Sequence, residues 1–133
     1  MEQYIELLKH NNIKVTPQRL AIVELMDING HISVREIFNK IKANFPSLSL
    51  ATVYKNVNSM LKNSFIKELK ITGQDSKYEL AKEAHSHLIC QSCGDVKDII
   101  LDTNSLISDA LEKSDYTISE SSLQLFGLCS NCQ

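Results

Sequence analysis

The chain of 133 residues is long enough for one domain, or for two small lobes of about 60 to 80 residues each, and too short for a large multi-pocket enzyme. Its composition, 43% hydrophobic and 23% charged with only four Gly and two Pro, excludes long disordered or collagen-like segments. No apolar run could span a bilayer and the first residues do not resemble a signal peptide, so we expect a cytoplasmic protein without membrane contact.

Charge is divided unevenly along the chain, although the net charge is only −2. Up to Lys77 there are 11 basic and 7 acidic residues, a charge of +4, and beyond it 3 basic and 9 acidic residues, a charge of −6. This polarity is expected of a chain whose first part meets a polyanion and whose second part holds cations. Unevenly solvated surfaces would give the same distribution, so charge leaves the choice open.

The first two helices are predicted from apolar spacing and from capping residues. Apolar residues over 4–8 predict a short helix that Asn11-Asn12 ends. Thr16 can then cap a second helix with its hydroxyl, and Pro17 suits the first helical position because its missing N–H costs nothing there. We expect this second helix to stop at Asn29-Gly30.

Two further helices follow with equally clear starts. Ser33 and Glu36 have the spacing of a capping box, and Phe45-Pro46 is predicted to stop the helix that they begin. Ser49 is predicted to cap a fourth helix over 50–62. On that helix we expect Val53, Val57, Met60 and Leu61 to face inward, and Thr52, Lys55, Asn56 and Ser59 to lie outside.

The periodicity then changes to that of strands, predicted over 65–71 and 77–80 with a turn at 72–75. Helices followed by a two-stranded hairpin are typical of a winged helix-turn-helix. The outer face of the fourth helix is short, polar and basic, and Tyr54 adds an aromatic ring, which suits a helix in a DNA major groove. An ordinary solvated helix face has the same composition.

A second, smaller lobe is predicted after a hinge at 81–84, so that domains 1–80 and 85–133 together give an α+β protein. The second lobe is of the α/β type. We expect two chains to form a homodimer through it, because so small a domain buries too little apolar surface to build a stable core alone. Its predicted elements are strands at His87–Cys90 and Val96–Leu101, a helix at Asn104–Lys113 and a strand at Ser122–Leu128.

All four cysteines occur in two Cys-x-x-Cys pairs, Cys90 with Cys93 and Cys129 with Cys132. Each pair can turn two sulfurs toward one metal, so the two pairs together predict a tetrahedral structural Zn2+ site. Disulfides are disfavoured in a reducing cytosol, and a redox-active motif would need only one pair at the start of a helix.

A second cluster, of mixed nitrogen and oxygen ligands, surrounds His85-Ser86-His87. Residues two apart on a strand point to the same side, so His85 and His87 can share one ion. Glu79 upstream and Asp98 downstream would add carboxylate oxygens, a set that suits Fe2+, Mn2+ or Zn2+. A lone His-x-His is more often a surface feature, and spacing alone assigns no role to the two remaining histidines.

Four segments in chain order carry a resemblance to a known family. They are Lys14-Val15-Thr16-Pro17-Gln18-Arg19-Leu20, Leu50-Ala51-Thr52-Val53-Tyr54-Lys55-Asn56, His85-Ser86-His87-Leu88-Ile89-Cys90-x-x-Cys93-Gly94 and Cys129-x-x-Cys132. Together they resemble the ferric uptake regulator (Fur) family over nearly the whole sequence. The resemblance implies a dimeric, metal-dependent DNA-binding repressor with an N-terminal winged helix and a C-terminal dimerisation domain.

The resemblance also implies individual roles. The four cysteines would hold structural Zn2+, and a regulatory Fe2+ or Mn2+ would bind to His31, Glu79, His85, His87 and Asp98. Since these five ligands come from the DNA-binding lobe, the hinge region and the dimerisation lobe, metal binding would fix the angle between the lobes. The resemblance also implies contacts with DNA. Tyr54 would contact base edges, Lys55 a phosphate and Lys14 a minor groove, and Ser49 and Thr52 would belong to the same DNA interface. Arg19 would contact either a phosphate or a partner inside the domain.

Local residues then favour one subtype. A zinc-uptake regulator usually has a cysteine in its sensing site, and here every cysteine is already committed. Iron regulators often carry a further site, whose positions are Ala84, Ser86 and Leu128 here. Asp98 resembles the peroxide-responsive type (PerR), although Glu79 does not. We therefore expect a PerR-like repressor, with an iron-responsive Fur-type repressor of iron-uptake genes as the alternative.

In the peroxide-responsive type, bound Fe2+ reduces peroxide and the oxidant that forms attacks a ligand imidazole, so that metal and DNA are released. His31 and His85 would be the imidazoles at risk. An enzyme is the less favoured interpretation. Two histidines and a carboxylate can form the triad of a non-haem iron oxygenase, but so short a chain leaves little room for open coordination positions or a substrate pocket. We expect no small-molecule substrate. A zinc-stapled adaptor would lack the salt-dependent DNA affinity that Lys14 and Lys55 predict.

Overall fold

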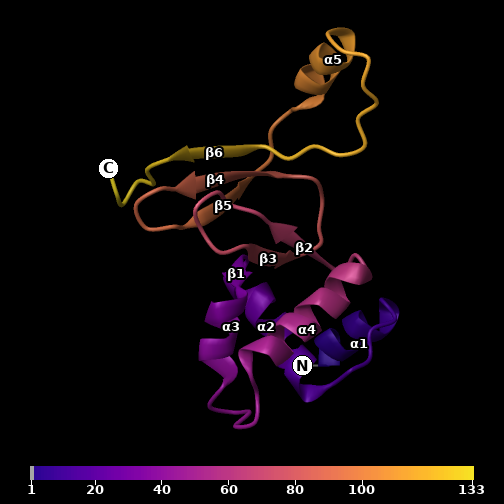
Figure 1. Ribbon diagram of the computed structural model, residues 1–133, viewed down its shortest axis with the longest axis vertical. Helices are drawn as coiled ribbons and strands as arrows, with labels where there is room; N and C mark the ends of the chain where they lie inside the picture. Colours follow the sequence, from indigo (N-terminus) through magenta and orange to yellow (C-terminus); the bar gives the residue numbers. More distant parts are fainter. Residues whose placement is uncertain (1) are drawn as a thin grey trace. The chain divides into compact units, whose positions relative to one another are not determined.

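The computed structural model describes residues 2–133, which form five helices and six strands and confirm the α+β fold class (Figure 1). The chain divides between Lys82 and Glu83 into two compact units. Among residues 2–133, no helix has the length and apolar character needed to cross a membrane.

The four predicted helices of the first unit are present with their caps. They are α1 (Glu2–His10), α2 (Pro17–Asn29), α3 (Val34–Ile41) and α4 (Leu50–Lys62). Thr16 accepts a hydrogen bond from the Arg19 N–H at 3.2 Å, and Ser49 accepts one from the Thr52 N–H at 3.1 Å. Ser33 and Glu36 form the predicted reciprocal capping box.

The predicted end of the third helix was wrong, because α3 stops at Ile41 rather than at Phe45-Pro46. Ile41 is the last buried residue of this helix, and residues 42–44 are exposed in a turn. Continuing the helix over residues 42–44 would therefore bury no large apolar side chain, and most helical stability in proteins comes from such burial.

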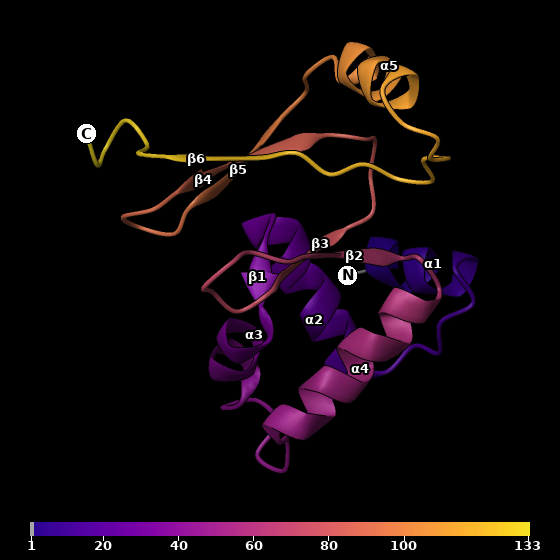
Figure 2. The ribbon, with the colours of Figure 1, turned by 45° about the horizontal axis from the view of Figure 1, so that its top comes forward.

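A three-stranded antiparallel sheet completes the first unit. It consists of β1 (Ile32–Ser33), β2 (Ile66–Leu69) and β3 (Lys77–Leu80) in the order β1-β3-β2 (Figure 2). The β2–β3 hairpin confirms the predicted wing, although β2 is shorter than the predicted 65–71. The sequence did not predict β1, which pairs Ile32 with Tyr78.

One apolar core holds α4 in place. Val53, Val57 and Met60 are fully buried and pack with residues from the other three helices and the sheet. We predicted that the polar residues of α4 face solvent. This was right for Lys55 and wrong in part for Asn56 and Ser59, which are half-buried. Thr52 is half-buried as well. The reason for Asn56 and Ser59 is that the Arg19 side chain, from the first turn of α2, reaches this side and donates hydrogen bonds to both.

The second unit contains the four elements predicted for it. They are β4 (Ser86–Cys90), β5 (Val96–Ile99), α5 (Asn104–Glu112) and β6 (Gln124–Gly127). The sheet has the order β5-β4-β6, with β4 antiparallel to β5 and parallel to β6 (Figure 1). Only Ile89 and Cys90 are buried hydrophobic residues in this unit, and no residue of α5 is buried.

The capping box gives a direct stability prediction. Ser33→Ala should lower the free energy of unfolding by about 1 kcal/mol, because it leaves the Glu36 backbone N–H without its capping oxygen. Urea unfolding of the full chain measures this. Ser47→Ala, at an exposed position, is the matched control and should change the value by less than about 0.5 kcal/mol. Equal effects of the two substitutions would contradict the capping role.

Candidate functional site

The parallel pairing of β4 and β6 brings the two cysteine pairs together. Cys90 ends β4 opposite Gly127, and Cys129 follows two residues later, so both Cys-x-x-Cys segments begin at the same end of the sheet. The Gln91 N–H donates to the Gly127 carbonyl at 2.8 Å and fixes this end. Gly94 turns the chain back toward β5 with a φ of 77°, a conformation that glycine adopts without strain.

The four thiols form a compact cluster with all sulfur atoms within 4.8 Å of one another. The backbone N–H groups of Cys129 and Cys93 donate to the Cys90 sulfur at 3.4 and 3.5 Å and lower the pKa of this thiol to about 6. A hydrogen bond with the Cys129 thiol raises the pKa of Cys132 to about 12. Four free thiols at this separation, one of them biased toward the thiolate, fit a tetrahedral Zn2+.

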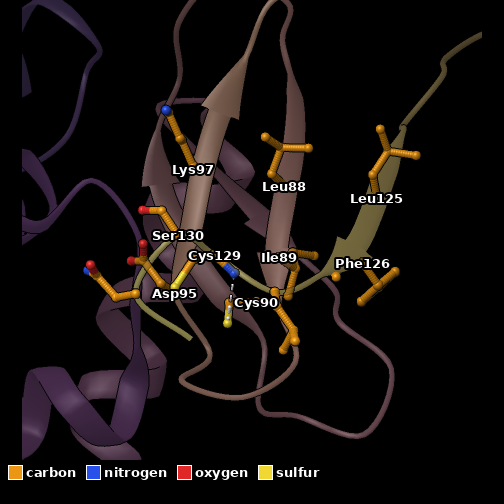
Figure 3. Close-up of a pocket in the computed structure, with 12 residues that line it drawn as sticks. Leu88, Ile89, Cys90, Asp95, Lys97, Leu125, Phe126, Cys129 and Ser130 are labelled. Carbon is orange, nitrogen blue, oxygen red and sulfur yellow. Dashed lines mark hydrogen bonds between the residues drawn. The ribbon is translucent and has the colours of Figure 1, made fainter. Parts of the chain in front are cut away.

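A shallow groove of about 460 Å³ adjoins this cluster on the second unit (Figure 3). Leu88 of β4 and Leu125 and Phe126 of β6 give it an apolar wall, and Lys97 of β5 and Asp95 add polar groups. Leu125 and Phe126 are each 46% exposed, so this sheet carries uncovered apolar surface directly beside the cysteines.

In the first unit, the predicted ligands His31 and Glu79 lie side by side. The β1–β3 register, in which Ile32 opposes Tyr78, places the preceding His31 opposite Glu79. Their Nε2 and Oε2 atoms are 2.7 Å apart, and both side chains are less than 10% exposed. The unpredicted strand β1 is therefore what brings these two residues together.

In the second unit, the predicted ligands His85, His87 and Asp98 converge. His87 on β4 opposes Asp98 on β5, and His85 precedes His87 by two residues, so that all three meet on one face of the sheet. The Nε2 atoms of both histidines are 3.4 Å from Asp98 Oδ1, and the two rings are 4.6 Å apart. His85 Nδ1 lies 2.7 Å from the Glu83 carbonyl oxygen, a contact that orients the ring and directs its Nε2 toward the cluster.

The candidate DNA-contacting residues lie at the start of α4, in the first turn of α2 and on the segment between α1 and α2. Tyr54 is 42% exposed on α4, next to the exposed Lys55. Ser49 and Thr52 share a hydrogen bond of 2.9 Å between their hydroxyl groups at the start of α4. Lys14 is exposed between α1 and α2. Arg19 bonds within the unit, one of the two roles that the resemblance left open.

Comparison with known proteins agrees with these features. The model of the ferric uptake regulator family matches residues 10–126. The peroxide-responsive repressor PerR of Staphylococcus saprophyticus is 29% identical over 135 aligned positions, which cover 100% of this chain and 91% of the relative.

Solved structures of the same kind superimpose along almost the whole chain. The ferric uptake regulator Fur of Helicobacter pylori, described with three functional metal-binding sites, gives a TM-score of 0.77 at 27% identity and covers 98% of this chain and 89% of its own. A zinc uptake regulator solved with zinc and DNA gives 0.74 at 25% identity, with 98% and 90% covered. The family match spans most of the sequence, and with the helix-turn-helix, the cysteine cluster and the histidine-carboxylate sets it shows that this chain belongs to the ferric uptake regulator family.

Proposed function

We propose that the protein is a cytoplasmic, homodimeric, metal-dependent repressor that binds double-stranded operator DNA. The observation that carries this proposal is that each of the two units holds a group of nitrogen and oxygen ligands. His31 and Glu79 supply two ligands from the first unit, and His85, His87 and Asp98 supply three from the second. An ion bound by both sets would restrict the units to one arrangement and so favour the DNA-binding form.

The two ligand sets suit different metals. The four thiols of the second unit would hold structural Zn2+, since thiolates prefer this ion and leave no open coordination position. The histidines and carboxylates would hold Fe2+ or Mn2+ as the regulatory metal, because imidazole and carboxylate ligands suit these harder ions. Zn2+ at the four thiols would thus stabilise the fold, and Fe2+ or Mn2+ at the histidines and carboxylates would control DNA binding.

The DNA interface is proposed to lie on the first unit. In the winged-helix arrangement α4 is the helix that enters a major groove, where Tyr54 would reach base edges and Lys55 a phosphate. Ser49 and Thr52 would contact DNA at the start of the same helix. Lys14, on the adjoining loop, would reach a minor groove.

The second unit is proposed to form the homodimer. Its helix α5 exposes Leu106 by 60% and Leu111 by 44%, and Ile100 and Tyr116 at either end of the helix are about three-quarters exposed. A unit with almost no buried hydrophobic residue gains a core when a second copy covers such a surface. A dimer also presents two α4 helices to successive major grooves.

Salt dependence tests the DNA-binding proposal. Binding of the Zn2+- and Mn2+-loaded protein to duplex DNA should weaken steeply as salt rises, and Lys55→Ala should reduce the slope of log K against log salt by about 0.9 for the phosphate contact that it removes. Fluorescence anisotropy over a salt series measures the slope. Lys113→Ala, at an exposed site on the second unit, should leave the slope unchanged. Affinity without salt dependence would contradict the proposal and favour a protein-binding adaptor.

We further propose that the regulatory signal is peroxide, with iron availability as the alternative. The similarity to a peroxide-responsive repressor, Asp98 in the ligand set, and Ala84, Ser86 and Leu128 at the positions of a further iron-regulator site support this choice. Fe2+ in the mixed site would supply the electrons that reduce peroxide. His31 and His85 are the ligand side chains expected to gain oxygen, after which they no longer bind metal well and the protein leaves DNA.

Members of this family are transcription regulators rather than enzymes. The reaction with peroxide distinguishes a sensor from an enzyme. A sensor of this kind consumes its own ligand side chains and stops. We therefore expect self-modification without turnover of a small-molecule substrate. Sustained turnover of any substrate by the iron-loaded protein would favour an oxygenase.

A further inference from the structure

Arg19, in the first turn of α2, connects two segments that are far apart in the sequence. Its Nε donates to Asn56 Oδ1 at 3.0 Å and its Nη2 donates to Ser59 Oγ at 3.4 Å, and both acceptors lie on α4. Its Nη1 donates to the backbone carbonyl of Lys14 at 3.1 Å. All three guanidinium nitrogens are therefore used to join α4 to the segment that carries Lys14.

A second residue of α2, Gln18, also bonds to α4 at this junction. Asn56 accepts from Arg19 through Oδ1, and its Nδ2 donates to Gln18 Oε1 at 3.4 Å. An amide whose oxygen and nitrogen are both bonded inside the protein is fixed in one orientation. Asn56 therefore ties the first turn of α2 to α4, and this use of its donor and acceptor competes with reading the edge of an adenine.

Geometry, rather than charge alone, distinguishes Arg19 at this position. Its three partners are neutral oxygen atoms of an amide, a hydroxyl and a carbonyl. A lysine would keep the positive charge, but a single ammonium group on a flexible stem cannot reproduce a planar fork with three directed bonds. The substitution Arg19→Lys therefore separates the charge of this side chain from its bonding geometry.

We propose that Arg19 is a positioning residue for DNA binding, which holds Lys14 and α4 in a fixed relation so that they engage neighbouring grooves together. This inference rests on the proposed function, in which Lys14 reaches a minor groove and α4 a major groove. A segment that is already fixed loses less conformational freedom when DNA binds, so the junction raises affinity without itself touching DNA.

A double-substitution cycle tests the proposal on the full chain loaded with Zn2+ and Mn2+. Wild type, Lys14→Ala, Arg19→Lys and the double variant are titrated against one duplex, selected from a random-sequence library by the wild-type protein. We expect Arg19→Lys to weaken binding about tenfold, a cost of about 1.4 kcal/mol. In the Lys14→Ala background the same substitution should cost about twofold or less, because the contact that it positions is already gone.

A second variant approaches the same junction from α4. Asn56→Ala removes the acceptor for Nε and leaves Arg19 itself unchanged. We expect it to reproduce both the loss of affinity caused by Arg19→Lys and the dependence of that loss on Lys14. Ser47→Ala, which lies outside the junction on the exposed turn before α4, should bind as wild type does.

Three results would overturn the proposal. The first is a loss of affinity in the double variant equal to the product of the losses in Lys14→Ala and Arg19→Lys. The second is unchanged binding by Asn56→Ala, as expected if Arg19 contacts a phosphate directly. The third is a lower fraction of binding-competent protein with an unchanged Kd, as expected if Arg19 serves folding only. Failure of the proposed function looks different: DNA affinity would then be independent of salt and of both Lys14→Ala and Lys55→Ala.

Discussion

Cys90→Ser should remove zinc from the protein and unfold the second unit. Structural Zn2+ contributes about 10–16 kcal/mol to the folding of zinc-finger peptides, as much as the whole stability of a typical domain. Here the unit has only Ile89 and Cys90 as buried hydrophobic residues, so burial cannot compensate for the lost metal. Zinc content and protease resistance of residues 83–133 measure the effect, and we expect both to fall to the level of the chelator-treated wild type.

The matched control for Cys90→Ser lies inside the second cysteine pair. Ser130 is exposed and has no sulfur, so Ser130→Ala should keep one Zn2+ per chain and wild-type protease resistance. The first unit, with its own apolar core, should remain folded in both variants. A Cys90→Ser protein that retained zinc and stayed protease-resistant would show that the cysteine cluster is not the element that holds this unit together.

His87→Ala should abolish metal-dependent DNA binding while leaving the zinc content unchanged. His87 faces Asp98 across the β4–β5 pair, and its Nε2 is 3.4 Å from the carboxylate oxygen that His85 also approaches. Substituting residues that only support a metal ligand costs about 10 to 100-fold in metal affinity, so loss of a ligand should exceed about 100-fold. Titration of Mn2+ against DNA binding, with zinc measured in parallel, gives both quantities.

The control for this variant is the one histidine outside the two ligand sets. His10 is exposed at the end of α1, so His10→Ala should respond to Mn2+ as wild type does. The result that would sink the regulatory-metal assignment is Mn2+-dependent DNA binding in His87→Ala at wild-type metal concentrations.

The first unit was largely predictable because capping residues mark where three of its helices begin. Thr16, Ser33 and Ser49 each accept the expected capping hydrogen bond, and such caps depend on residues within three positions of one another. The strand β1 gave no comparable signal, since two residues cannot show an alternating pattern. Its existence depends on pairing with β3, more than forty residues away in the sequence, and that pairing is what sets His31 opposite Glu79.

The residues of the cysteine cluster and of the histidine-carboxylate groups were predictable, and the way the chain assembles them was not. Cysteine spacing identified the four thiols, but the long gap between the pairs is closed by the parallel β4–β6 pairing, which no local pattern specifies. For Arg19 the limit was different. Its partners Asn56 and Ser59 are polar residues on what looked like a solvated helix face, and only the position of the Arg19 side chain in the structure shows that this face is partly covered.

The central claim, peroxide sensing through a ligand histidine, is tested most directly by peptide mass. The protein is loaded with Fe2+ without oxygen and given a small excess of hydrogen peroxide, and an Mn2+-loaded sample is treated in parallel. Peptide masses and DNA binding are then measured on the same samples. We expect one added oxygen on the peptides that contain His31 or His85, together with release of DNA, in the iron sample only. Unmodified histidines, with DNA binding that simply follows the free Fe2+ concentration, would contradict peroxide sensing and identify an iron-responsive repressor.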